Sequence, residues 1–293
     1  MKASRIAIYL FSLAALLALL GEPASAQRGG PEKLLRWNYY GSSSDEESSE
    51  PGSIETDRPD FTESALTVGY GVVQLETGYT FTYDSDSNGS TRSHSFPESL
   101  LRVGMLAEWF ELRIDWNYAD NRVNNFGGGI DTISGGEDLG IGCKIALTKQ
   151  ECILPETGII LQMSVPTGAE ELTADQVLPG VNYIYEWQVT ENFSTGAQSQ
   201  FNLAVDDESS RTYTEFSQSW TTGYDWTDAF GSYAEWYMFA PAGADTNHNQ
   251  QYFNGGFKYL LNDNLQWDIR AGLGLNDAAD DYFIGSGLSI RWL

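Results

Sequence analysis

The amino-acid sequence predicts an all-β fold, a single antiparallel up-and-down transmembrane β-barrel of about 12 strands. Three observations favour this fold. Apolar and polar residues alternate with a period of two in twelve segments, one face of these segments repeatedly carries charges and glycines, and the connections between them alternate in length. A soluble sandwich shows the same alternation with its apolar face buried. The charged face and the alternating connections favour a barrel over a sandwich, because short turns on one side and longer loops on the other are typical of outer-membrane barrels.

The chain begins with features of export. Residues 1–26 resemble a signal peptide, with Lys2 and Arg5 before a 15-residue run that is apolar except for one serine, and a small-residue A-x-A pattern at its end. Residues 27–53 are polar and acidic, too poor in apolar groups to offset the entropy of ordering, and we expect a disordered periplasmic leader there. Residues 54–293 are then the barrel, and the expected location is the cell outer membrane.

The strands follow from the alternation. In the clearest of them, 110–118, Phe110 and Ile114 face one way, while Arg113 and Asp115 face the other. Apolar side chains on one face would meet lipid and polar ones would face the lumen. The expected strands are 72–83, 96–106, 110–118, 138–147, 156–166, 180–187, 193–205, 212–226, 230–240, 251–261, 265–275 and 282–293.

The connections between these strands fall into two classes. Those near 107–109, 148–154, 188–192, 227–229 and 262–264 are short and are assigned to the periplasmic side. The others are mostly longer and acidic and are assigned to the outside; they lie near 84–95, 120–137, 167–179, 206–211, 241–250 and 276–281. An even number of strands places both ends of the barrel on the periplasmic side.

Charge and cysteine content exclude several function classes. The net charge of −25 argues against nucleic-acid binding, which needs a basic face. Cys143 and Cys152 lie nine residues apart, and export permits a disulfide, so a bridge and two free thiols both stay open. With two cysteines and the separated His94 and His248, we expect no metal site and no cofactor.

Alternation also identifies the charges that should face the lumen. We expect close pairs across neighbouring strands, Lys258 opposite Asp268 and Arg102 opposite Asp115. Either the luminal charges satisfy one another, or unpaired members line a pathway for small solutes. The candidates are Glu76, Glu98, Arg102, Glu111, Arg113, Asp115, Asp138, Lys144, Glu186, Glu235, Lys258, Asp268, Arg270 and Arg291.

Several motifs resemble a known bacterial family, the outer-membrane transporter family named for the meta-pathway of phenol degradation. The motifs are IETDRPDFTES at 54–64, VQLETGY at 73–79, ESLLRVG at 98–104, EDLGIG at 137–142, VPTG at 165–168, AEWY at 234–237, NGGFKY at 254–259, NLQWDIRAG at 264–272 and DYFIGSGL at 281–288. The resemblance spans residues 54–293. It implies a small outer-membrane barrel and the passage of small solutes, aromatic or hydrophobic compounds among them.

One of these motifs precedes the first strand and suggests a further feature. We expect the segment with Asp57, Arg58 and Asp60 to tuck into the periplasmic mouth of the barrel, where Arg58 would pair with an inward acid such as Glu76. A simple periplasmic turn is the alternative.

The sequence leaves three functions to compare. The first is a channel or transporter for small solutes, with outer-membrane lipids, the barrel-assembly machinery and the solutes as partners. The second is a non-conducting structural or adhesion barrel, whose acidic loops at 206–210 and 276–281 would bind Ca²⁺ through oxygen ligands. The third is an outer-membrane lipid hydrolase, for which only Ser93, His94, Ser95 and His248 offer the required side chains. We expect the chain not to be an enzyme.

Overall fold

A computed structural model describes residues 52–206 and 209–293 of the chain. The predicted signal peptide, and all but the last two residues of the predicted leader, lie outside these residues. Within the described part, every regular element is a β-strand, and no helix has the length and apolarity needed to cross a membrane.

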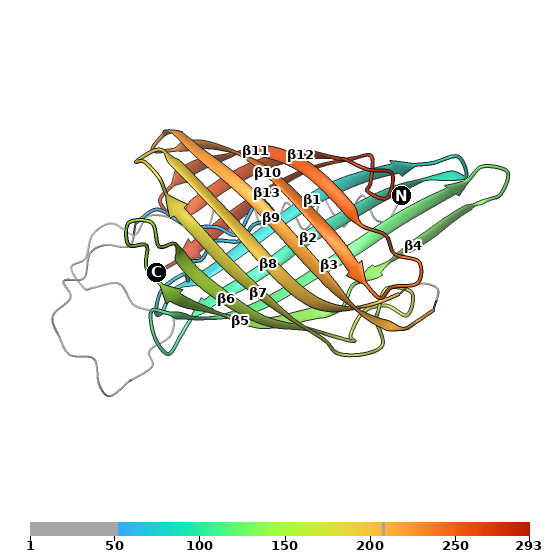
Figure 1. Cartoon of the computed structure of the whole chain (residues 1–293), viewed down its shortest axis with the longest axis horizontal. Coiled ribbons are helices and arrows are strands. Elements are labelled where there is room, and N and C mark those ends of the chain that lie inside the picture. The colour runs from blue at the N-terminus through green and yellow to red at the C-terminus, as the bar shows by residue number, and fades with distance from the viewer. Residues whose placement is uncertain (1–51, 207–208) are drawn as a thin grey trace.

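Thirteen strands form one antiparallel sheet that closes on itself (Figure 1). Strands that follow one another in the sequence pair with each other, except that β4 and β5 both pair with β3, and the pairing of β1 with β13 closes the ring. The fold predicted from the sequence, a closed antiparallel 12-strand barrel, is confirmed, with one extra strand, β4. The strands are β1 (Val73–Ser85), β2 (Gly89–Gly104), β3 (Phe110–Asn125), β4 (Ile130–Gly136), β5 (Leu139–Thr148), β6 (Glu156–Val165), β7 (Leu178–Gln188), β8 (Phe193–Val205), β9 (Thr212–Thr227), β10 (Phe230–Ala242), β11 (Gln250–Asn262), β12 (Leu265–Gly274) and β13 (Tyr282–Trp292).

The extra strand corrects one prediction. The sequence suggested a loop over 120–137, but β3 continues to Asn125 and β4 returns beside it, with Tyr118 opposite Gly136. The partner of β3 then becomes β5, with Asp115 opposite Gly140, so β4 and β5 act as one strand interrupted by a β-bulge. The hairpin of β3 and β4 projects beyond most of the other strands at the long-loop end (Figure 1).

The register confirms the position predicted for one charged residue and overturns that of another. Lys258 lies directly opposite Asp268, as the turn at 262–264 predicted. Arg102 lies opposite Arg113 rather than Asp115, because the connection between these strands spans residues 105–109 and is longer than the predicted one at 107–109. Arg102 reaches back to Glu111 instead, with 2.8 Å between Nε and Oε1.

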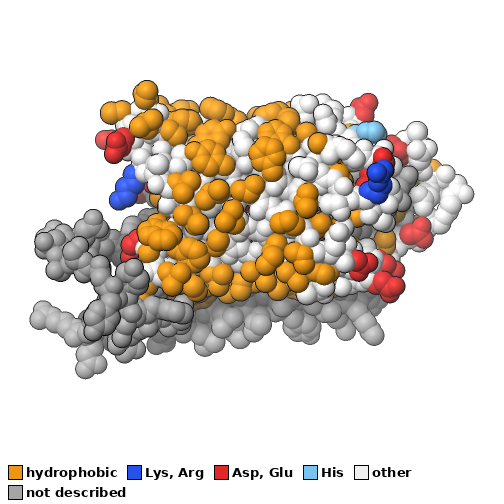
Figure 2. All heavy atoms as spheres, turned by 60° about the horizontal axis from the view of Figure 1, so that its bottom comes forward, with side chains coloured by type: hydrophobic (Ala, Val, Ile, Leu, Met, Phe, Trp, Pro, Cys, Tyr) orange, Lys and Arg blue, Asp and Glu red, His pale blue; other side chains and the backbone are white. Residues whose placement is uncertain are grey.

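The two faces of the barrel wall differ in chemistry. Outward side chains are large and apolar, and the face shown in Figure 2 carries a broad hydrophobic surface with its charged side chains toward the two ends. Inward side chains are polar and buried, among them Gln74, Asn182, Gln198 and Ser217. The wall therefore encloses a polar lumen, as expected of a barrel whose outer face meets lipid.

Candidate functional site

The lumen is occupied by the chain's own residues 54–70, which we call the luminal segment. It enters at the short-turn end, where the Ile54 N–H donates to the Asp263 carbonyl, and leaves at the same end, where the Tyr70 N–H donates to Glu108. Between these points it runs across the inside of the barrel, and Ile54, Thr62 and Ala65 are buried. The prediction that this segment tucks into the mouth understated how far it enters.

Inward side chains of the wall hold the backbone of the luminal segment. Glu76 accepts the N–H groups of Asp57 and Arg58, and Glu235 accepts those of Phe61 and Thr62. Further along the segment, Glu111 accepts the Val68 N–H at 2.9 Å. A non-regular backbone satisfies its polar groups here without a sheet partner, because carboxylates of the wall supply the acceptors. The wall thus fixes the segment in place.

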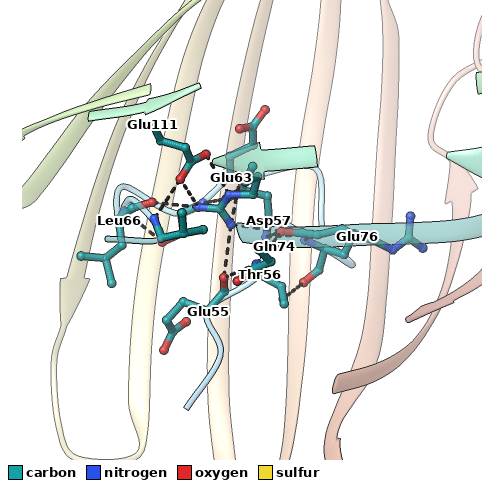
Figure 3. A network of polar contacts seen from close by, with 12 residues as sticks. Glu55, Thr56, Asp57, Glu63, Leu66, Gln74, Glu76 and Glu111 are labelled. Carbon is teal, nitrogen blue, oxygen red and sulfur yellow. Dashed lines mark hydrogen bonds and ion pairs between the residues drawn. The ribbon is translucent and has the colours of Figure 1, made fainter. Parts of the chain in front are cut away.

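Three cations of the wall converge on one carboxylate of the segment, that of Asp57. Figure 3 shows Asp57 within the polar network that surrounds it, with Glu63, Glu76 and Glu111 nearby. Lys144 Nζ lies 2.8 Å from Oδ1, and Arg113 Nη1 and Arg102 Nη1 lie 2.5 and 3.4 Å from Oδ2. All four side chains are nearly inaccessible to solvent. Arg102 and Arg113 also bond Glu111, so the cluster joins β2, β3 and β5 to the luminal segment.

The guanidinium of Arg58 occupies a second cluster. It bonds Glu98 at 2.8 Å and Asp268 at 3.3 Å, and a Cβ on Gly78 or Gly287 of the wall would lie less than 2.5 Å from its atoms. These two glycines make room for the guanidinium against the sheet. The sequence suggested Glu76 as the partner of Arg58, but only the Arg58 backbone N–H bonds Glu76.

An aromatic contact anchors the middle of the luminal segment. The ring of Phe61 stacks on Tyr237 with 4.8 Å between centroids, and Tyr237 in turn stacks on Tyr252 at 4.9 Å. Phe239 meets Phe61 edge-on at 5.3 Å. These rings come from β10 and β11, so Phe61 joins the luminal segment to the opposite sector from the Asp57 cluster.

Two cavities lie in the lumen on the long-loop side of the luminal segment. The first, of about 370 Å³, is lined by Glu63 of the segment and by Glu98, Arg113, Asp115 and Trp116 among other wall residues. The second, of about 360 Å³, is bordered by Phe61 and by aromatic and polar side chains of the wall. Those side chains include Tyr237, Phe239, Tyr252, Phe283, Asn254, Arg270 and Asp280.

Most of the predicted luminal charges bond the luminal segment directly. These are Glu76, Glu98, Arg102, Glu111, Arg113, Lys144, Glu235, Asp268 and Arg270. Within the segment, Asp57 and Arg58 are central to the two ionic clusters, and Asp60 follows them beside Glu235.

The other predicted residues lie elsewhere. Asp115 is exposed to the first cavity, and Glu186 faces Glu156 across the β6–β7 ladder. Lys258 pairs with Asp225 at 3.5 Å, although Asp268 is its register neighbour. Arg291 bonds the Gly52 carbonyl at the short-turn rim. Asp138 sits in the bulge between β4 and β5, where it accepts N–H groups of the 167–174 loop rather than joining the luminal charges.

Sequence reasoning missed several residues of the site. Glu63 and Phe61 belong to the luminal segment, and Gln198 accepts the Glu63 N–H and donates to the Phe61 carbonyl. The inward amide of Gln198 could have been found from the alternation of β8. Nothing in the sequence marked which wall strands Glu63 and Phe61 approach.

The structure also shows the positions of the two cysteines and of His94. Cys143 lies in β5 and Cys152 in the following turn, and both thiols are free. His94 was assigned to an outer loop, but it lies in β2 opposite Phe81, and its Nδ1 is hydrogen-bonded to the Tyr79 hydroxyl at 2.7 Å.

At the long-loop end, Asp206 ties two outer connections together. Its carboxylate accepts the Ser209 N–H in its own connection and the N–H groups of Asp245 and Thr246 in the β10–β11 connection. The hydrogen bonds from Ser209 and Thr246 hold the pKa of Asp206 well below its usual range. A depressed pKa in the folded protein means that this tie is present at neutral pH and is lost as the pH falls through that pKa.

We therefore expect Asp206→Asn to loosen the β10–β11 connection. The asparagine side chain offers one carbonyl acceptor where the carboxylate offers two, so hydrogen exchange at the Asp245 and Thr246 amides should accelerate at pH 7. Asp277→Asn, in another exposed outer connection, is the matched control and should leave these two amides unchanged. Equal exchange in Asp206→Asn and the unsubstituted protein would contradict the assignment.

Comparison with known proteins identifies similar barrels and the family of the chain. In structure, the chain is similar to an outer membrane channel from Pseudomonas putida F1, with a TM-score of 0.63 and 14% identity over 80% of this chain and 99% of that one. It is also similar to the transport unit of the autotransporter AIDA-I from Escherichia coli, with a TM-score of 0.49 and 10% identity over 76% and 89% of the two chains. No protein with a curated description matches in sequence. At 14% identity, the similarity to the Pseudomonas putida F1 channel shows the fold alone, that of an outer-membrane barrel. A family model matches residues 56–292, nearly the whole described region, and the chain therefore belongs to the family described as "Putative MetA-pathway of phenol degradation".

Proposed function

We propose that this protein is an outer-membrane channel or transporter through which small solutes, aromatic or hydrophobic compounds among them, pass by way of the barrel lumen. The observation that carries the proposal is the pair of cavities, each of about 360–370 Å³, beside the luminal segment. Each has room for a small solute but not for a polymer. A solute entering from the long-loop end would meet these cavities first and the luminal segment second.

The lining of the second cavity supports aromatic or hydrophobic solutes. Tyr237, Tyr252 and Phe283 offer apolar rings, and Arg270 and Asn254 offer polar groups beside them. The Asn254 Oδ1 and the Arg270 Nε are buried without a hydrogen-bond partner. A pocket that combines apolar walls with a few polar groups is the usual form of a small-molecule site.

Conductance of the refolded protein in a planar lipid bilayer tests this proposal. We expect discrete current steps in potassium chloride, and liposomes that contain the protein should swell faster in small solutes than liposomes without it. Small currents are expected, because the luminal segment narrows the route. The absence of any current and of any swelling in small solutes would refute a channel.

The density of bonds across the lumen favours a second candidate, a non-conducting structural barrel. The Asp57 cluster holds the luminal segment to β2, β3 and β5, the Arg58 cluster holds it to β2 and β12, and Phe61 holds it to β10. If this segment never leaves, the barrel would serve only as a stable outer-membrane body. The same bilayer measurement separates the two candidates, because a structural barrel predicts no current in any solute.

A further inference from the structure

The wall carries a cationic site that is filled by the protein's own carboxylates. Arg102, Arg113 and Lys144 project from three neighbouring strands, and all three approach Asp57. Two of them also face Glu63, with Arg113 Nη2 at 2.7 Å and Lys144 Nζ at 3.9 Å from its Oε2. Both carboxylates belong to the luminal segment, which is attached to the wall here by no covalent bond. Among the described residues, the wall itself supplies only Glu76 and Glu111 against these three cations, so without the luminal segment it would present a positive charge to the lumen.

The two carboxylates differ in how accessible they are. The Asp57 side chain is 3% exposed, whereas the Glu63 side chain is 20% exposed. Glu63 and Arg113 both line the first cavity, together with Leu100. A solute in this cavity would thus reach the Glu63–Arg113 pair without first displacing Asp57.

The chemistry of this pair specifies the kind of solute. A guanidinium binds a carboxylate through two parallel N–H groups, and an ammonium beside it adds a further charge-assisted bond. Glu63 supplies such a carboxylate from within the chain. Its place on Arg113 fits the carboxylate of a solute whose apolar body rests against Leu100, which lies opposite the inward residues Glu76 and Asp115.

We propose that Arg113 and Lys144 form a carboxylate-binding site for small organic anions, and that Glu63 occupies this site until a solute carboxylate replaces it. The inference rests on the proposed function in one respect, that solutes enter the lumen. It goes beyond that function by naming small monocarboxylates as a solute class and Glu63 as the internal competitor.

Binding of benzoate to the full chain in detergent, measured by isothermal titration calorimetry, tests the proposal, with benzamide as the uncharged probe of the same shape. Glu63→Gln removes the competing charge and should raise the affinity for benzoate about tenfold or more, while the affinity for benzamide stays unchanged. Asp115→Asn is the matched control, since it removes a carboxylate from the same cavity that has no ion pair with Arg113 or Lys144 among the described residues. It should change benzoate affinity by about twofold at most.

Two results would overturn the proposal. One is equal benzoate affinity in Glu63→Gln and the unsubstituted protein; the other is an equal gain for benzamide. Glu63→Ala serves as a second variant if Glu63→Gln does not fold, and the same two results apply to it. Bilayer current is recorded separately for each variant. Current without a gain in benzoate affinity refutes only the carboxylate site, whereas a gain without current supports the site and refutes the channel.

Discussion

Replacing Asp57 with asparagine is expected to release the luminal segment from the barrel. The substitution keeps the shape of the side chain but leaves Arg102, Arg113 and Lys144 with one carboxylate fewer in a site that is almost closed to solvent. Removing one partner of a buried ion pair costs about 3–5 kcal/mol, because the remaining charge is left uncompensated. The barrel can lower this cost by letting water in, which requires the luminal segment to move away.

Hydrogen exchange measures this release. The N–H groups of Phe61, Thr62 and Val68 donate to Glu235 and Glu111 and should exchange slowly in the unsubstituted protein. In Asp57→Asn these amides should exchange faster, by about a hundredfold or more, and the bilayer current should rise. Glu55→Gln is the control, because it neutralises an exposed side chain of the same segment. Continued protection of these amides in a folded Asp57→Asn barrel would show that the ionic cluster does not hold the segment.

The sequence was sufficient to predict the barrel wall. Alternation with a period of two marks a strand whose two faces meet different surroundings, and most predicted strand bounds lie within a few residues of the observed ones. The extra strand β4 was missed because Glu137 and Asp138 form a bulge, which shifts the alternation by one residue. Glycines at 127–129 and 135–136 further obscure the pattern that would have extended β3 and revealed β4.

The site was predictable only in part. Alternation correctly placed Arg102, Arg113 and Lys144 on the inner face, because the face of a residue depends on local periodicity alone. The partners of these residues depend on a separate chain segment that forms no strand and has no periodicity. Thus Arg58 was assigned to Glu76 rather than to Glu98 and Asp268, which lie 40 and 210 residues further along the chain. The contribution of Glu63 was not anticipated.

A double-mutant cycle on Arg58 and Asp268 is expected to show that the second ionic cluster stabilises the fold. Arg58→Leu leaves Asp268, whose side chain is fully buried, without its guanidinium, and should lower the free energy of unfolding by about 3–5 kcal/mol. Asp268→Leu should cost less, since Arg58 keeps its shorter bond to Glu98 at 2.8 Å. The measurement is urea-induced unfolding of the refolded barrel in lipid bilayers.

The double variant decides the interpretation. With both charges replaced by leucine, neither is left unpaired, so the loss should fall short of the sum of the two single losses by about 1–3 kcal/mol. Lys258→Leu with Asp225→Leu is the matched control, because that pair is 43–45% exposed and lies 3.5 Å apart. Exposed pairs contribute little, and its coupling should stay below about 1 kcal/mol. Additive losses at Arg58 and Asp268 would mean that the interaction between the two side chains does not contribute to the free energy of unfolding. The backbone hydrogen bonds to Glu76 and Glu235, rather than the charges, would then keep residues 54–70 inside the barrel.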